Sequence, residues 1–193
     1  MRPRRDASKP GQRSVWDFPR PPAYEQWHEH VEVRFAGRTI AATDDAWCVL
    51  ETSHPPTYYL PLSAFEPGVL REVDSVGTVC EWKGAASYYD VVVGDQVAAR
   101  AAWTYRNPRG DAAVLRDHVA LYAREMDACL VDGSPVTPQP GGFYGGWITP
   151  TVSGPFKGSP GTMGVVKALA SHPRLAPLKH EWRAGASRRT CPW

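Results

Sequence analysis

Three short segments of the chain each read as two β-strands joined by a tight turn, and this repeated pattern constrains the fold most. The segments are VEVRFAGRTIAAT (31–43), YYDVVVGDQVAARAAW (88–103) and DACLVDGSPVT (127–137). Their turns fall at Ala36-Gly37-Arg38, Gly94-Asp95 and Asp132-Gly133. An Asp-Gly pair between two apolar runs is a strong signal for a two-residue hairpin turn. Three hairpins in one chain predict a fold built from antiparallel β-sheet.

The rest of the chain adds more short strands and little helix. We expect strands near 47–51, 57–61, 78–82 and 118–123. Residues 62–70 could form one or two helical turns, and residues 161–172 are the best helical candidate. The predicted fold class is therefore mainly β: a single compact β-rich domain with barrel-like or tent-like sheets and one or two short helices.

The two ends of the chain differ from its middle in composition. Residues 1–22 and roughly 173–193 are rich in proline and arginine, which predicts loose order. At 193 residues the chain is long enough for one well-formed core. We predict a basic, proline-rich N-terminal arm over 1–22, a β-rich domain over 23–165 and a basic C-terminal extension over 166–193.

The distribution of charge argues against a dedicated nucleic-acid binder. Residues 1–20 have a net charge of +4 and residues 167–193 of +5, although the whole chain carries only +2. The middle of the chain is therefore acidic, at −7. Nucleic-acid binders usually gather their basic residues on the folded surface. We expect no specific nucleic-acid partner and interpret the basic tails as solvated ends.

Several other classes of site and location lack their usual signals. No apolar run approaches the roughly 20 residues that span a bilayer, so we expect no membrane partner. The N-terminus has no apolar segment of the secretory type, which predicts a cytoplasmic protein. Four cysteines without CxxC spacing argue against zinc and against a disulfide framework. His28 and His30 form a possible metal pair without a third ligand, so we predict no metal site.

Lysine is used in an unusual way. Within residues 21–166 the only lysines are Lys83 and Lys157, and both stand in an aromatic-Lys-Gly tripeptide, WKG and FKG. Lysine is a compact ammonium that burial can shift towards neutrality, and the glycine that follows lets the backbone approach an anion. We predict Lys83 as a catalytic residue and Lys157 as an anion anchor. The alternative is that each lysine covers an aromatic ring at a turn.

The segment ETSHPPTYYLP (51–61) contributes the other polar candidates. Glu51 follows an apolar strand, where burial can raise the pKa of a carboxyl group and suit it to acid or base catalysis. His54, before two prolines, could share that role or act as a ligand. We assign both as catalytic, and Thr52 and Tyr59 as ligand-binding. The alternatives are a salt-bridged glutamate and a histidine bonded to a loop carbonyl.

The stretch QPGGFYGGWITP (139–150) places four glycines among three aromatic residues. Paired glycines occur where a chain turns sharply or approaches another group closely. The aromatic side chains then form a binding surface or a buried corner. We predict that Tyr144 and Trp147 from this stretch, with Trp82 and Tyr88, bind the ligand.

Six motifs together resemble the bacterial domain-of-unknown-function family 427, sometimes labelled nucleotidyltransferase-like. They are SVWDFPRPP, LETSHPPTYYLP, CEWKGAASYY, AAWTYRNP, DGSPVTPQPGGFYGGWITP and GPFKGSPGT, in order over about residues 14–165. The sequence departs from the family pattern at Glu81, where proline is usual, and at Tyr89 and Val165, where tryptophan is common. The resemblance implies a compact β-rich fold, similar to tent-like folds with tryptophan-lined pockets. It supplies no reaction and no cofactor.

These residues support three functional hypotheses. The leading one is a small-molecule pocket protein, an enzyme that acts on a small planar or anionic substrate by acid/base chemistry. The alternative is a non-enzymatic interaction module that binds a peptide or partner protein through its aromatic platform. The third is a nucleotide-handling transferase, although no paired aspartates for a metal clamp are present. The cofactor and the oligomeric state stay open.

Overall fold

The structure is a computed structural model of the chain, and it describes residues 4–74 and 77–159. The predicted helix at 161–172 and the predicted C-terminal extension at 166–193 lie outside the described residues. The division into arm, domain and extension stays a prediction. Within the described part the fold is mainly β, as the hairpin signals indicated, and its helix is limited to short 3₁₀ segments.

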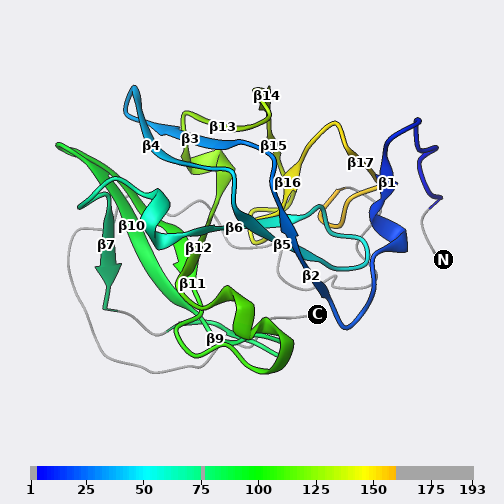
Figure 1. The fold of residues 1–193 in the computed structure, drawn as a ribbon, viewed down its shortest axis with the longest axis horizontal. Helices are drawn as coiled ribbons and strands as arrows, with labels where there is room; N and C mark the ends of the chain where they lie inside the picture. The colour runs from blue at the N-terminus through cyan, green and yellow to red at the C-terminus, as the bar shows by residue number, and fades with distance from the viewer. Residues whose placement is uncertain (1–3, 75–76, 160–193) are drawn as a thin grey trace, which may run out of the picture.

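The largest element of the fold is a seven-stranded antiparallel sheet (Figure 1). From edge to edge its strands are β2 (Ala23–Trp27), β5 (Ala46–Leu50), β6 (Thr57–Pro61), β12 (His118–Leu121), β11 (Gln96–Thr104), β10 (Ser87–Val93) and β7 (Leu70–Val73). The edge strands β2 and β7 do not pair with each other, so the sheet of the described residues is open and no barrel closes.

A four-stranded sheet lies along one side of the molecule, at the top of Figure 1. Its order is β14 (Ser134–Pro135), β13 (Ala128–Val131), β3 (Val31–Phe35) and β4 (Arg38–Thr43). The hairpins β3–β4, β10–β11 and β13–β14 confirm the three predicted from sequence. In two of them both turn residues have positive φ, at Ala36-Gly37 and Asp132-Gly133. Such turns match the twist of the paired strands.

Shorter elements complete the fold. Two-stranded pairs form between β1 (Arg13–Ser14) and β17 (Val152–Ser153), β8 (Val79–Cys80) and β9 (Gly84–Ala85), and β15 (Thr137–Pro138) and β16 (Trp147–Ile148). The 3₁₀ helices are η1 (Val15–Asp17), η2 (Leu62–Ala64), η3 (Gly110–Leu115) and η4 (Ala123–Glu125). Of the turns expected at 62–70, only η2 forms. Among the described residues, no helix has the length and apolar character needed to cross a membrane.

Neighbouring residues of the large sheet belong to two different apolar clusters. Tyr58 packs in a cluster that joins both sheets, whereas Tyr59 packs in a second cluster on the opposite face. Ala102 and Trp103 divide in the same way. This follows from the two-residue period of a strand, which sends successive side chains to opposite faces. The sheet is therefore covered on both faces, and the second face carries most of its aromatic side chains.

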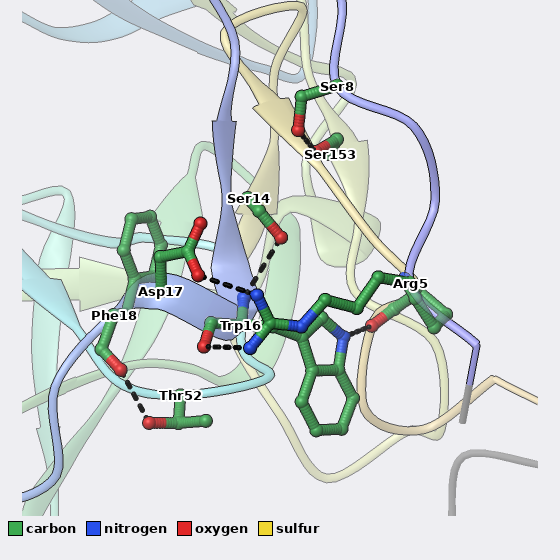
Figure 2. A network of polar contacts seen from close by, with 9 residues as sticks. Arg5, Ser8, Ser14, Trp16, Asp17, Phe18, Thr52 and Ser153 are labelled. Carbon is green, nitrogen blue, oxygen red and sulfur yellow. Dashed lines mark hydrogen bonds and ion pairs between the residues drawn. The ribbon is translucent and has the colours of Figure 1, made fainter. Parts of the chain in front are cut away.

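The N-terminal segment is more ordered than its composition predicted. Figure 2 shows Ser8 and Phe18 of this segment hydrogen-bonded to Ser153 and Thr52. Val15 and Phe18 are buried, and the indole N–H of Trp16 donates to the carbonyl of Pro155 at 2.9 Å. The hydroxyl of Thr52 donates to the carbonyl of Phe18 at 2.5 Å. The expectation of loose order was wrong for residues 13–18, because their apolar side chains complete the core.

Candidate functional site

Six of the ten predicted site residues line one cavity of about 80 Å³ on the second face of the large sheet. They are Glu51, His54, Tyr59, Lys83, Tyr88 and Tyr144. The strands β5, β6, β10 and β11 bring residues to this cavity, and the loop after β5 and the 139–145 segment contribute others. The fold thus gathers residues that are up to 93 positions apart in the sequence.

A tight loop between β5 and β6 positions Glu51 and His54. The backbone N–H of His54 donates to the carbonyl of Glu51 at 3.0 Å, and Ser53 between them has a φ of 72°. The backbone N–H of Ser53 donates to the carbonyl of Val15 at 2.9 Å. The buried N-terminal segment therefore stabilises the loop through this hydrogen bond. Both side chains line the cavity.

Glu51 is a buried carboxyl group surrounded by cations. Only 5% of Glu51 and 6% of Lys83 is exposed. Burial raises the pKa of Glu51, and the positive charges of Lys83, Arg20 and Lys157 oppose that rise. One of these cations is Arg20, whose Nε lies 3.9 Å from Glu51 Oε1. A carboxyl group with a raised pKa beside a lysine is a suitable acid/base group.

His54 is buried in the same cavity and is neutral at pH 7. Burial lowers the pKa of His54 to about 3, and the positive charge of Lys157 acts in the same direction. Its Nδ1 lies 3.1 Å from the side-chain nitrogen of Gln139, which is itself only 3% exposed. The ring of Tyr144 packs edge-on against His54, with centroids 4.8 Å apart. These contacts fix the imidazole in one orientation.

Aromatic side chains form most of the remaining wall. The indole N–H of Trp103 donates to the hydroxyl of Tyr59 at 3.1 Å. The ring of Tyr122 lies 4.6 Å from that of Trp103, centroid to centroid. Tyr88 is held by a hydroxyl contact with Thr78 at 2.8 Å. The wall offers flat surfaces to a planar ligand, with few side chains free to move away.

The glycines of the 139–150 stretch allow the loop to lie against this wall. A Cβ at Gly145 would overlap the indole ring of Trp103. A Cβ at Gly146 would stand 2.5 Å from Gln139 Oε1 and 2.7 Å from the carbonyl oxygen of Pro55. Only residues without a side chain can approach so closely. The prediction of close approach explains both positions.

The other four predicted residues lie elsewhere. Trp147 is fully buried in the core between the sheets, where it stacks on Tyr58 at 5.1 Å and donates to the carbonyl of Leu121 at 3.0 Å. Thr52 faces Phe18. Trp82 lines a separate depression beside Tyr24, under the guanidinium of Arg20. The structure therefore does not bring these three side chains to the cavity.

Lys157 is placed close to the cavity without lining it. Its ammonium nitrogen lies 5.3 Å from the centroid of the Tyr144 ring, and Tyr144 does line the cavity. The carbonyl of Lys157 accepts a hydrogen bond from Gln139 at 2.9 Å. Lys83 therefore lines the cavity, whereas Lys157 lies beside it and covers the Tyr144 ring, as the alternative interpretation of a turn lysine describes.

Tyr122 and Gln139 are among the wall residues that the sequence prediction did not name. Tyr122 directly follows β12 and adjoins the apolar run HVAL, so it resembled ordinary core. Gln139 opens the glycine-rich stretch, where the glycines and aromatics dominated the interpretation. A polar residue next to a proline and two glycines was the available signal. The burial of Gln139 at the cavity, which suggests a functional role, depends on the folded structure.

The described residues contain no group of three or more His, Cys, Asp or Glu that could hold a metal ion. His30, one of the possible metal pair, instead contacts Asp44 Oδ1 through its Nδ1 at 2.6 Å. Cys48, Cys80 and Cys129 are buried free thiols. Burial raises the pKa of Cys129 to about 12. Protonated thiols of this kind serve as small apolar core residues.

The comparison with protein families agrees with the motifs. No curated protein matches the chain. The family model described as "Domain of unknown function (DUF427)" matches residues 23–132, which is more than half of the chain. The matched range contains Glu51, His54 and Lys83 and ends before Gln139. The chain therefore belongs to the DUF427 family of domains of unknown function.

Proposed function

We propose that this protein binds a small planar or anionic molecule in the cavity and transfers a proton to or from it. The observation that carries the proposal is the burial of an acid and a base, Glu51 and Lys83, against the same cavity. Burying a charge is costly unless it is paired or needed for chemistry. Two such residues in a space of about 80 Å³ favour a functional site over a structural ion pair.

The charges around the cavity favour an anion. Lys83, Lys157 and Arg20 act on Glu51 as positive charges, and Glu81 acts as a negative one. Counting Glu51 itself, three cations face two carboxylates. Electrostatic attraction is stronger in a partly buried site than in water, because the effective dielectric is lower. An anionic ligand would therefore balance the site rather than add to an existing excess of negative charge.

The proposed chemistry is proton transfer through Glu51. Its raised pKa makes the Glu51 carboxylate a stronger base than an exposed one. As a base, Glu51 takes a proton from the bound molecule, and the ammonium of Lys83 stabilises the negative charge that develops on it. As an acid, the same carboxyl group returns the proton. The flat rings of Tyr59 and Tyr88 support a planar ligand.

The volume of the cavity limits the group that it can enclose. A dry cavity of about 150 Å³ is known to bind benzene, and this one measures about 80 Å³. The enclosed part suits a carboxylate or phosphate group with few further atoms. Phe143 lines the cavity with 43% of its surface exposed, so a larger ligand would extend past it into solvent.

The test is a thermal-shift titration with acetate, benzoate and inorganic phosphate at constant ionic strength. An anion at about 100 times its Kd should stabilise the wild type by about 2.7 kcal/mol. Lys83→Ala should lose that response, and Lys9→Ala, which removes an exposed lysine outside the cavity, should keep it. Equal responses in both variants would assign the anion to a different site. No response in any protein would favour the interaction module instead.

A further inference from the structure

We infer that Gln139 holds His54 as the Nε2–H tautomer, so that His54 offers the ligand a neutral hydrogen-bond donor and not a base. The inference rests on the proposed function for the presence of a ligand. It refines the role of His54, which the sequence left open between acid, base and ligand. Gln139 becomes a positioning residue, since it acts through His54.

The orientation of the Gln139 amide is set by two backbone groups. The backbone N–H of Gly146 can only donate, and it bonds Gln139 Oε1 at 3.1 Å. The carbonyl of Lys157 can only accept, and it lies 2.9 Å from Gln139 Nε2. If the amide oxygen and nitrogen were exchanged, the amide nitrogen would face the Gly146 N–H, donor against donor, and the amide oxygen would face the Lys157 carbonyl, acceptor against acceptor. The backbone therefore dictates which end of the amide faces His54.

The tautomer of His54 follows from that orientation. The amide nitrogen of Gln139 is a donor with two hydrogens, and one of them is used by the Lys157 carbonyl. The second is directed to His54 Nδ1, at 3.1 Å, which must therefore accept. A neutral imidazole has one protonated and one unprotonated nitrogen. With Nδ1 unprotonated, the proton resides on Nε2.

The charged groups around His54 keep the ring neutral. Lys157, Lys83 and Arg20 all disfavour a positive charge on it, and burial acts in the same direction. Glu51 lines the same cavity as His54. The lowered pKa of His54 comes from burial and from these cations, and the contact with Gln139 opposes it. The tautomer therefore follows from the hydrogen-bond geometry alone, since a doubly protonated ring could not accept from Gln139.

In this arrangement the two titratable side chains of the β5–β6 loop, His54 and Glu51, have different roles. His54 provides an N–H donor, and Glu51 remains the group that exchanges protons. A donor beside the Lys83 ammonium suits an oxygen atom that carries or develops negative charge, such as a carboxylate or phosphate oxygen. A ligand that offers only hydrogen-bond donors would not fit it.

The decisive measurement is a long-range ¹H–¹⁵N NMR correlation of the ligand-free wild type at pH 7, with His54 assigned from the spectrum of His54→Asn. A protonated Nε2 and an unprotonated Nδ1 are expected. A proton on Nδ1, or on both nitrogens, would overturn the inference. The measurement needs no ligand, so its result is independent of the proposed function.

Gln139→Glu provides a second test, with Gln96→Glu, at the exposed first residue of β11, as its matched control. A carboxylate cannot donate to Nδ1, so the His54 signal should change to the Nδ1–H or the doubly protonated form. Acetate and phosphate affinity should fall by about tenfold, while the control keeps both. An unchanged His54 signal in folded Gln139→Glu would contradict the role of Gln139. A correct tautomer with no anion binding in the wild type would instead refute only the proposed function.

Discussion

The hydroxyl of Tyr59 accepts a hydrogen bond from the indole N–H of Trp103, 3.1 Å away, across the floor of the cavity. Tyr59 is on β6 and Trp103 on β11, with β12 between the two strands. Both side chains are almost completely buried. This hydrogen bond links β6 to β11 across β12 and holds the two rings at a fixed distance, because neither ring can rotate without losing the bond.

Tyr59→Phe should therefore destabilise the protein although it leaves the ring in place. The change strands the indole N–H of Trp103 away from water, which costs about 1–3 kcal/mol. Chemical denaturation monitored by tryptophan fluorescence measures the loss. A free energy of unfolding within about 0.5 kcal/mol of the wild type would mean that the bond contributes nothing to stability.

Gly145→Ala should damage both stability and the cavity. The added methyl group overlaps the Trp103 ring, so the loop or the ring must shift, at a cost of about 1–3 kcal/mol. Gly68→Ala is the control: its backbone has a φ of +81°, which disfavours a side chain, but no atom stands within 4 Å of the added Cβ. Both variants should lose stability, and only Gly145→Ala should lose anion affinity in the thermal-shift assay. Equal affinity in the two would contradict the close approach.

The stability of the protein should decrease as the pH falls from 6.5 towards 3. His54 has a pKa of about 3 in the folded state, below its ordinary value of 6.5, so the unfolded chain binds more protons in that window. The slope for one such group reaches about 1.4 kcal/mol per pH unit. His54→Gln should flatten this slope relative to the wild type, with urea unfolding at several pH values as the measurement. Parallel curves would show that His54 titrates normally.

Phe18→Ala should be strongly destabilising, since it removes a buried ring from the N-terminal segment. Large-to-small changes at buried phenylalanine cost about 3–5 kcal/mol. The neighbouring Asp17→Ala, at an exposed position that pairs with Arg5, should change stability by less than about 1 kcal/mol. Thermal unfolding of both variants measures the difference. A mild effect of Phe18→Ala would mean that the segment docks weakly.

The hairpins could be predicted because their signals are local. The turns at Asp132-Gly133 and Ala36-Gly37 depend on the backbone conformation of these adjacent residues, which has positive φ at both positions of each turn. The packing of the sheet on both faces was harder to predict from the sequence. Tyr58 and Tyr59 are identical in type, and only the neighbouring strands decide which of them faces the core and which the cavity.

The site was partly predictable for a related reason. Lys83 and Glu51 are unusual in their own segments, so the sequence indicates them without knowledge of the fold. Trp147 was predicted to bind the ligand but lies in the core, and Gln139 lines the cavity without having been predicted. Trp147 matches a core space that only the two assembled sheets create, and the importance of Gln139 comes from partners on three separate segments.

The pairing of β1 with β17 also has a consequence for the order of folding. Trp16 and Pro155 are joined by a hydrogen bond between residues 139 positions apart, so nearly the whole described chain lies inside that loop. Closing so long a loop is entropically costly until the intervening strands have shortened the path between its ends. The N-terminal segment should then dock late, after the hairpins. The loop of Glu51 and His54 rests on that segment, so the cavity should be among the last parts of the molecule to form.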